Sequence, residues 1–126
     1  MNAGELRKKI QERQREATAL LHRIKQRPPL MRGIVYLLRR KCGKAGCRCQ
    51  KGDLHESWVL SVPDRGRKQI RTVPRGKRME WMAMTERYRC FRRSRARLVR
   101  VFSEIIELVD ELERERTVPP SKQERK

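Results

Sequence analysis

The sequence of 126 residues contains few apolar residues, and these form no long run. Only 37% of the chain is hydrophobic, so a large globular core is not available, and something else must help to stabilise the fold. No apolar run approaches the ~20 residues of a membrane-spanning helix, and the N-terminus lacks the apolar centre of a signal peptide. We therefore expect a cytoplasmic protein without a membrane-spanning segment.

Aromatic residues and catalytic groupings are also scarce. Aromatic residues make up 5% of the chain, which leaves little for a platform on which single-stranded bases stack. The sequence shows no Ser-His-Asp set, no paired carboxylates and no glycine loop that would cradle phosphate. Glu56, beside His55, is the carboxylate that suggests a general base for a catalytic zinc. We therefore expect no enzymatic activity, and a zinc hydrolase that uses Glu56 is the weakest alternative.

Negative charge is scarce as well. The chain carries 34 Lys and Arg against 15 Asp and Glu, which leaves a net charge of +19. Such an excess predicts a polyanionic partner, and nucleic acid is favoured over an anionic membrane surface. We expect DNA rather than RNA, because the few aromatic residues favour contact with a duplex backbone. A DNA-binding protein of the cytoplasm is expected to be associated with the nucleoid. The predicted contacts are Arg39, Arg40, Lys41, Lys44, Arg48, Lys51, Arg67, Lys68, Arg71, Arg75, Lys77, Arg78, Arg89, Arg92, Arg93 and Arg97.

Four potential metal ligands occur within fourteen residues, namely Cys42, Cys47, Cys49 and His55. Three thiolates and an imidazole are what Zn²⁺ needs for a closed tetrahedral site, which can hold together a loop too polar to fold by itself. In a reducing compartment such a cluster indicates metal binding before a disulfide. The spacing differs from the C-x2-C pair of common zinc ribbons. The sequence predicts a structural zinc site of the zinc-knuckle kind.

Two alternatives to structural zinc stay open: reduced cysteines in a small core without metal, and a redox or iron–sulfur role. His55 is the weakest predicted ligand, because a lone histidine before a strand is often only a surface residue. Cys90 is a possible replacement, although its place in a helical pattern favours a buried thiol. We expect Gly43, Gly46 and Gly52 to supply the positive φ angles of a tight ligand loop.

The N-terminal segment has the pattern of an amphipathic helix that ends before Pro28 and Pro29. Between it and the next helix, three short segments indicate strands at residues 34–38, 57–62 and 68–73. Turn residues at 63–66 predict that the second and third strands pair as a hairpin. Tyr36 and Trp58 are expected to fill the small core. The face of the N-terminal helix is predicted to consist of Ala3, Leu6, Ile10, Arg13, Ala17, Leu20 and Ile24.

A long C-terminal helix is predicted by a heptad pattern that runs through residues 79–116. Its first half, residues 86–100, holds seven arginines and one glutamate, whereas residues 104–115 hold six acids and one arginine. We expect the first half to lie along phosphates and the second half to be repelled by them. The predicted seam consists of Trp81, Met84, Tyr88, Phe91, Arg95, Leu98, Phe102, Ile105, Val109 and Leu112.

These patterns together predict an α+β protein in which the two helices form a long antiparallel, coiled-coil-like pair. A small three-stranded antiparallel element would carry the zinc-knuckle-like loop. We expect a single domain over residues 1–116, composed of an N-terminal helix (1–27), the β-element (32–75) and the long helix (77–116). Residues 117–126 are expected to form a disordered tail. Because the first helix is shorter, part of the long helix is left for a second subunit, which predicts a homodimer.

Residues 42–55, the strand at 58–61, the segment 71–74 and the helix at 86–89 resemble a family of small bacterial and archaeal proteins of unknown function. The pattern of that family is approximately CGKxxCxCxxGxLHGP, then an aromatic strand and a long helix with a tyrosine-arginine pair. The resemblance covers about residues 32–112. The chain departs from it at Glu56 and Ser57, where the family has Gly-Pro.

The resemblance implies that Cys42, Cys47, Cys49 and His55 are signature positions. Members of the family are often encoded beside transposases, so the resemblance suggests an accessory role in transposition or recombination, with a transposase or recombinase as partner. Two other functions stay open. They are an RNA-binding protein and a helical assembly adaptor that does not bind nucleic acid.

Overall fold

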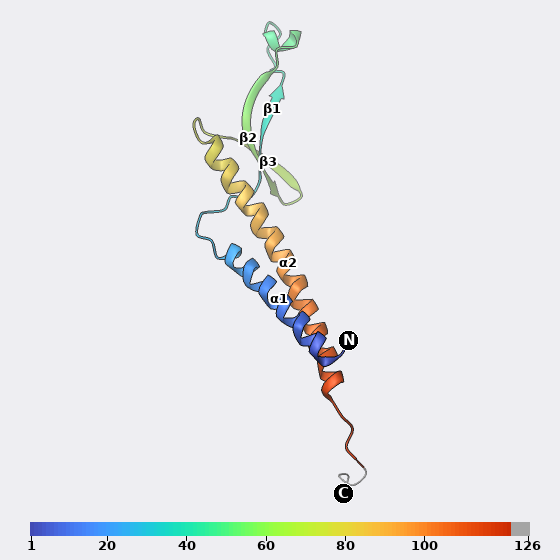
Figure 1. The fold of residues 1–126 in the computed structure, drawn as a ribbon. Helices are drawn as coiled ribbons and strands as arrows, with labels where there is room; N and C mark the ends of the chain where they lie inside the picture. Colours follow the sequence, from blue (N-terminus) through green and yellow to red (C-terminus); the bar gives the residue numbers. More distant parts are fainter. Residues whose placement is uncertain (122–126) are drawn as a thin grey trace. The chain divides into compact units, whose positions relative to one another are not determined.

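The computed structural model describes residues 1–121 and combines helices with an antiparallel sheet, which confirms the predicted α+β class (Figure 1). The elements follow in the order α1 (Ala3–Ile24), β1 (Ile34–Arg40), the 3-10 helix η1 (Arg48–Lys51), β2 (His55–Asp64), β3 (Arg67–Thr72) and α2 (Arg78–Arg116). None of the helices described is long and apolar enough to cross a membrane. Residues 117–121 contain neither helix nor strand, and the rest of the predicted tail lies outside the described residues.

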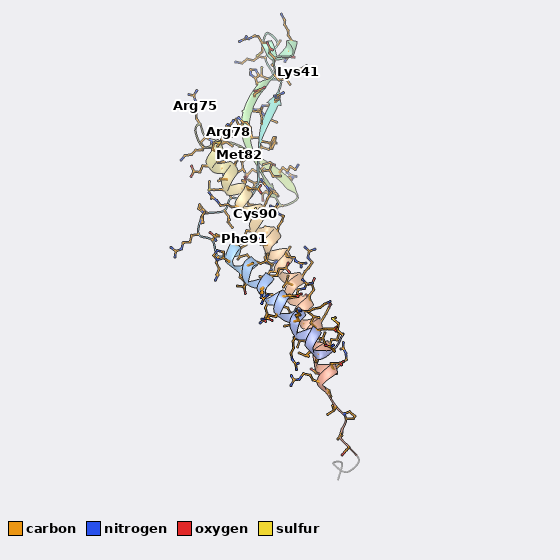
Figure 2. The ribbon with its side chains drawn as sticks, viewed as in Figure 1. Lys41, Arg75, Arg78, Met82, Cys90 and Phe91 are labelled. Atoms are coloured by element: carbon orange, nitrogen blue, oxygen red, sulfur yellow. The ribbon has the colours of Figure 1, made fainter. Side chains whose placement is uncertain are left out.

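The chain forms two compact units. The helical unit consists of Met1–Gln26 and Phe91–Lys126, and the sheet unit consists of Arg27–Cys90. The border therefore falls within α2, between Cys90 and Phe91, which are labelled in Figure 2. The helical unit holds α1 with the later turns of α2, and the sheet unit holds the sheet, the cysteine loop and the first turns of α2.

Helix α1 begins with a side-chain cap. The Oδ1 atom of Asn2 accepts a hydrogen bond from the backbone N–H of Glu5 at 2.9 Å, and the Asn2 amide donates to the Glu5 carboxylate at 3.0 Å. This reciprocal arrangement satisfies a backbone donor that the first helical turn would otherwise leave without a partner. All seven residues of the predicted α1 face are buried or half-buried, so that prediction is confirmed.

Helix α1 packs on α2 within the helical unit, where the two lie side by side (Figure 1). Ala17, Leu20 and Val101 form a buried cluster, and Leu98 and Ile105 pack against it. Arg13 of α1 pairs with Glu104, whereas Glu16 pairs with the earlier residue Arg97. Residues later in α1 thus contact residues earlier in α2, so the two helices run in opposite directions.

Three positions of the predicted seam are not buried by α1. Arg95, Phe102 and Val109 are exposed, and their neighbours Ser94 and Val101 are buried instead. Within the sheet unit α2 buries Thr85 and half-buries Trp81, Met84 and Tyr88, whereas within the helical unit it turns a different face towards α1. A single heptad line cannot describe both faces, because each part of α2 packs against a different neighbour.

The three strands form one antiparallel sheet in the order β1-β2-β3. The central strand β2 supplies two of its most buried side chains, Val59 and Leu60, which lie opposite Tyr36 and Val35 of β1. Strands β2 and β3 are joined by two residues with positive φ, Arg65 (49°) and Gly66 (79°). Two positive φ angles are the mark of the type I′ turn that suits the twist of a hairpin. The predicted hairpin is therefore confirmed.

The segment before β1 is fastened to the first turns of α2 inside the sheet unit. The guanidinium of Arg87 donates to the carbonyl of Pro29 at 2.9 Å, and that of Arg89 donates to the carbonyl of Gly33 at 3.3 Å. Gly33 has φ of 126°, and a Cβ at this residue would lie 2.7 Å from the carbonyl oxygen of Ser61. Only glycine fits this approach without strain.

Candidate metal centre

The four predicted metal ligands lie on the connection between β1 and β2, at the end of that hairpin (Figure 1). Arg40 and His55 are the last pair of the β1–β2 ladder, so the sheet brings the two ends of the cysteine loop together. Cys42 follows β1 closely, His55 begins β2, and Cys47 and Cys49 lie at the start of η1. The strand pairing thus brings together ligands that are up to thirteen residues apart in the sequence.

The ligand atoms of Cys42, Cys47, Cys49 and His55 all lie within 4.8 Å of one another. The Sγ atoms of Cys42 and Cys49 are 3.4 Å apart, and the Sγ atom of Cys47 is 3.1 Å from Nε2 of His55. In a tetrahedral zinc site, two sulfurs are separated by about 3.8 Å and a sulfur and a nitrogen by about 3.5 Å. Small movements of these side chains would therefore suffice to place all four atoms around one ion, so the residues fit a metal of this kind.

Hydrogen bonds shape the loop around this cluster. The backbone N–H of Cys42 donates to Sγ of Cys49 at 3.2 Å, and the side-chain amide of Gln50 donates to the carbonyl of Cys42 at 3.0 Å. An N–H group that points at a cysteine sulfur stabilises the thiolate that binds metal. The role of Gln50 depends on the turn of η1, so the sequence pattern gave no indication of it.

Only one of the three loop glycines has the predicted backbone conformation. Gly52 ends η1 with φ of 108°, as expected for a glycine after a helical turn. Gly43 and Gly46 do not have positive φ, so the prediction for these two is wrong. Nothing lies within 4 Å of a Cβ built on either residue. The loop is open at both positions, and it reaches its shape through η1 and the strand ends instead.

The thiols differ in their electrostatic surroundings. The pKa of Cys42 is lowered, first by a hydrogen bond from the backbone of Lys44 and then by the Cys49 side chain. The pKa of Cys49 is raised because the side chain is fully buried, which disfavours the charged form. A bound cation would supply the positive charge that a buried Cys49 thiolate needs.

His55 belongs to the cluster, and Cys90 does not. Cys90 lies on α2, where its thiol donates to Oε1 of Glu86 at 3.5 Å. It is exposed, so the expectation of a buried helix thiol is wrong. Of the two candidates for the fourth ligand, His55 is therefore the one that lies with the three cysteines.

Most of the predicted nucleic-acid contacts have exposed side chains, and Arg89 and Arg97 are the half-buried exceptions. Six exposed basic residues lie on β1 and in the cysteine loop, close in sequence to the metal ligands. Arg67, Lys68 and Arg71 lie on the exposed strand β3. Arg92, Arg93 and Arg97 belong to the helical unit. The six bases around the cluster are Arg39, Arg40, Lys41, Lys44, Arg48 and Lys51.

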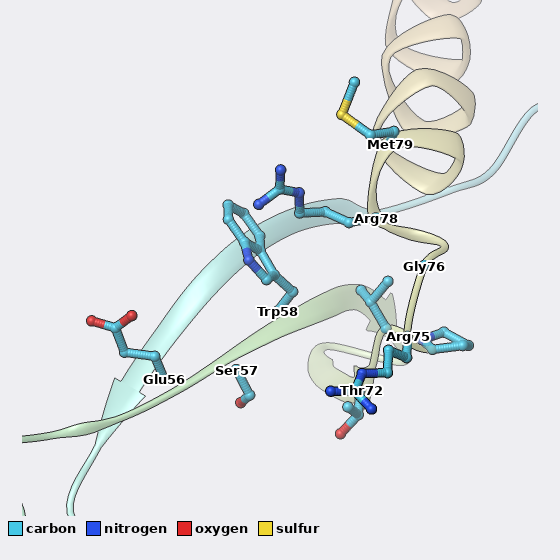
Figure 3. Close-up of a pocket in the computed structure, with 10 residues that line it drawn as sticks. Glu56, Ser57, Trp58, Thr72, Arg75, Gly76, Arg78 and Met79 are labelled. Atoms are coloured by element: carbon cyan, nitrogen blue, oxygen red, sulfur yellow. The ribbon is translucent and has the colours of Figure 1, made fainter.

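Arg75 and Arg78 line a hollow in the sheet unit together with Trp58, as Figure 3 shows. The guanidinium of Arg78 lies over the Trp58 ring, 4.6 Å from its centre, in a cation–π contact. Trp58 was expected to fill the core, but the residue is half-buried and borders this hollow. The contact joins the start of α2 to the middle of β2, which no local pattern could have indicated.

Some predicted contacts already have acidic partners. Arg39 pairs with Glu56 at 3.2 Å, and Lys77 pairs with Glu80 at the same distance. Arg89 pairs with Glu86 at 2.7 Å. The pairs of Arg39 and Lys77 are exposed, and phosphate can compete for these two basic residues because exposed ion pairs contribute little stability.

Comparisons with known proteins give no further guide to this site. No protein-family model and no curated protein matches the sequence, and no solved structure matches the fold.

Proposed function

We propose that this protein binds nucleic acid through the exposed bases of its sheet unit, and that a zinc ion holds together the loop that carries many of them. The observation that supports this most strongly is the placement of the metal cluster. Its four ligand atoms lie within 4.8 Å of one another in the same loop that displays Lys41, Lys44, Arg48 and Lys51 to solvent. A metal there would keep these like charges close together, which is useful only if a polyanion neutralises them.

Charge balance supports a polyanionic ligand. Residues 30–80 contain fourteen bases and four acids, so internal ion pairs cannot neutralise this part of the chain. Arginine is the more frequent base, and its planar guanidinium forms paired hydrogen bonds with phosphate oxygens. The ligand proposed is therefore the phosphate backbone, with little or no dependence on base sequence.

Zinc is the metal proposed for the cluster, in a structural role. Cys42, Cys47, Cys49 and His55 would hold it as a zinc-knuckle-like loop, and four protein ligands would leave no position for a reacting water. Zinc would cross-link the loop, in which all residues from 41 to 54 except the three cysteines are exposed. We accordingly propose no enzymatic activity for the site.

We propose DNA over RNA because the basic side chains of the sheet unit lie on strands and a loop that have few aromatic residues beside them. A surface of this kind favours contact with the backbone of a duplex over stacking of single-stranded bases. The hollow at Trp58 offers one aromatic face, and Arg78 already covers it. The family resemblance favours a place in transposition or recombination, and the proposed location is therefore the cytoplasm, at the nucleoid.

The helical unit is proposed to serve assembly. Its two helices run in opposite directions and meet through Ala17, Leu20 and Val101, which is consistent with a short antiparallel coiled coil. A transposase or recombinase is the proposed protein partner.

The test is fluorescence anisotropy with labelled duplex DNA, single-stranded DNA and structured RNA, repeated over a range of salt concentrations. The double variant Lys44→Ala with Lys51→Ala removes two loop charges without altering a ligand. We expect it to weaken DNA binding about equally for all sequences and to flatten the plot of log affinity against log salt by about two units.

The matched control is Lys8→Ala with Lys9→Ala, which removes two exposed charges from α1. We expect the salt slope of this control to remain close to that of the unaltered protein. Tight binding of RNA at salt concentrations that release DNA would replace the DNA proposal by an RNA-binding protein. Absence of salt-sensitive binding to any nucleic acid would contradict the proposal and leave an assembly adaptor.

A further inference from the structure

Helix α2 carries a second apolar stripe that α1 does not cover. Val99, Phe102, Ile106 and Val109 are 52%, 47%, 59% and 42% exposed, although each is a large hydrophobic residue. Their spacing of three, four and three residues places them on one side of the helix. A shallow hollow lies among Val99, Phe102, Ser103 and Ile106, so the stripe offers a recess as well as projecting side chains.

This stripe is distinct from the face that α2 turns towards α1. Contact with α1 is made by Leu98, Val101 and Ile105, which lie one residue before members of the stripe. Successive residues of a helix differ in direction by about 100°, so the two faces point well apart. Packing of α1 therefore leaves the stripe open, and an exposed apolar patch of this kind commonly marks an interaction site.

The ends of the stripe carry opposite charges. Arg95, four residues before Val99, and Glu113, four residues after Val109, lie on the same side of the helix as the stripe. Both residues are exposed. We propose that the stripe binds the same stripe of a second copy of this chain, in an antiparallel helix pair related by a two-fold axis near residue 104. The proposal does not depend on the proposed function of the sheet unit.

The order of residues makes the stripe complementary to itself in this arrangement. Pairing about residue 104 sets Val99 against Val109 of the second copy and Phe102 against Ile106 of the second copy. The same register sets Arg95 against Glu113 twice, once on each side of the axis. The next positions on the line, Arg92 and Arg116, are both basic, so the complementary stretch ends with the Arg95–Glu113 pairs.

Parallel pairing lacks this complementarity. It would set Arg95 against Arg95 and Glu113 against Glu113, which places like charges on both ends of the contact. The stretch from Arg95 to Glu113 is about 27 Å long at 1.5 Å per residue. Charge order together with the apolar spacing therefore selects a second copy, and selects its direction.

Sedimentation equilibrium of the full chain, freed of nucleic acid by nuclease and a high-salt wash, tests the proposal. We expect a reversible dimer in the micromolar range. Phe102→Glu should weaken dimerisation at least about 100-fold, since it places a charge in the centre of both halves of the contact. Met82→Glu is the matched control, because Met82 is a similarly exposed residue of α2 in the sheet unit, and it should dimerise as the unaltered chain does. Far-UV circular dichroism verifies that both variants keep their helices.

Charge reversal then tests the direction of pairing. Arg95→Glu should weaken the dimer about ten-fold at low salt, and Glu113→Arg should do the same, because each change turns two attractive pairs into repulsive ones. The double variant should recover most of the lost affinity, since antiparallel pairing again sets opposite charges together. A chain that stays monomeric at high micromolar concentration overturns the proposal. A dimer that the double variant fails to restore, or that Phe102→Glu leaves intact, overturns it as well.

Discussion

Arg97 of α2 donates two hydrogen bonds to the carboxylate of Glu16 of α1, from Nε to Oε1 at 2.7 Å and from Nη2 to Oε2 at 3.0 Å. The side chains are 35% and 33% exposed, and Glu104 approaches the same guanidinium at 3.7 Å. Arg97 is one of the basic residues that the sequence predicts to contact phosphate. Because Arg97 lies between two carboxylates, we assign it to the pairing of the helices and predict that it contributes little to contact with phosphate.

Replacement of Arg97 should therefore affect stability more than binding. We expect Arg97→Ala to lower the melting temperature, because it leaves the Glu16 carboxylate without its strongest partner. Affinity for nucleic acid should change little. Arg71→Ala is the control with the opposite expectation, since Arg71 is an exposed basic residue of β3 in the sheet unit: the melting temperature of this variant should stay the same while its affinity for nucleic acid falls. Differential scanning fluorimetry and anisotropy on the same samples separate the two effects. An Arg97→Ala protein of normal stability and weakened affinity would contradict this assignment.

The same pair predicts a loss of stability in acid. The hydrogen bond from Arg97 lowers the pKa of Glu16 below its usual value of 4.5, and the charges of Arg97 and Arg13 act in the same direction. A carboxylate with a lowered pKa in the folded state stabilises the fold above its unfolded pKa, and this contribution is lost as the pH falls through the folded pKa. Melting temperatures measured from about pH 6 to about pH 3 should therefore fall less for Glu16→Gln than for the unaltered chain. The exposed residue Glu12, changed to Gln, provides the comparison and should leave the pH profile unaltered.

The secondary structure was predictable wherever local residues determine it. The spacing of apolar residues and the two prolines after it predicted α1, and the turn-forming residues 63–66 predicted the β2–β3 hairpin. The buried face of α2 was less predictable. Arg95, Phe102 and Val109 fit a heptad line, but which face of α2 is covered depends on two different neighbours, and sequence spacing does not contain that information.

Gly33 should be essential for the sheet unit. A Cβ at this residue would lie 2.7 Å from the carbonyl oxygen of Ser61 and 2.8 Å from Cδ1 of Leu60, and its φ of 126° is strained for any other residue. We expect Gly33→Ala to reduce the free energy of unfolding by about 1–3 kcal/mol in urea titrations. Gly46→Ala is the matched control, since its added Cβ meets nothing within 4 Å. Equal stability of the two variants would show that β2 does not approach Gly33 this closely.

The role of Gly33 could not be predicted from the sequence, because the atoms that exclude a Cβ lie on β2, 27 or more residues further along the chain. The contact of Arg78 with Trp58 escaped prediction for the same reason. By contrast, the metal cluster was predictable because its ligands are close in sequence and their residue types are chemically specific. The conformations of Gly43 and Gly46 were not, since several loop geometries bring the same ligands together.

Loss of one ligand should strongly weaken metal binding. Cys49 is fully buried within the cluster, so Cys49→Ser is expected to lower zinc affinity at least about 100-fold, more than changes around the ligands typically do. Limited proteolysis should then cleave the loop at Lys41, Lys44 or Arg48, while circular dichroism shows that the helices persist. Cys90→Ser removes a thiol outside the cluster and should retain zinc and resist cleavage. Loss of zinc in both variants would contradict the ligand set.

The most direct test of the central claim is the metal content and the 260 nm absorbance of protein purified without chelator. We expect one zinc per chain together with nucleic acid that co-purifies at low salt and is removed by nuclease or by high salt. Removal of the zinc should then weaken rebinding of DNA, because the bases of the cysteine loop are no longer held together. Protein that is free of both metal and nucleic acid, and that binds DNA no better after zinc is added, would contradict the account.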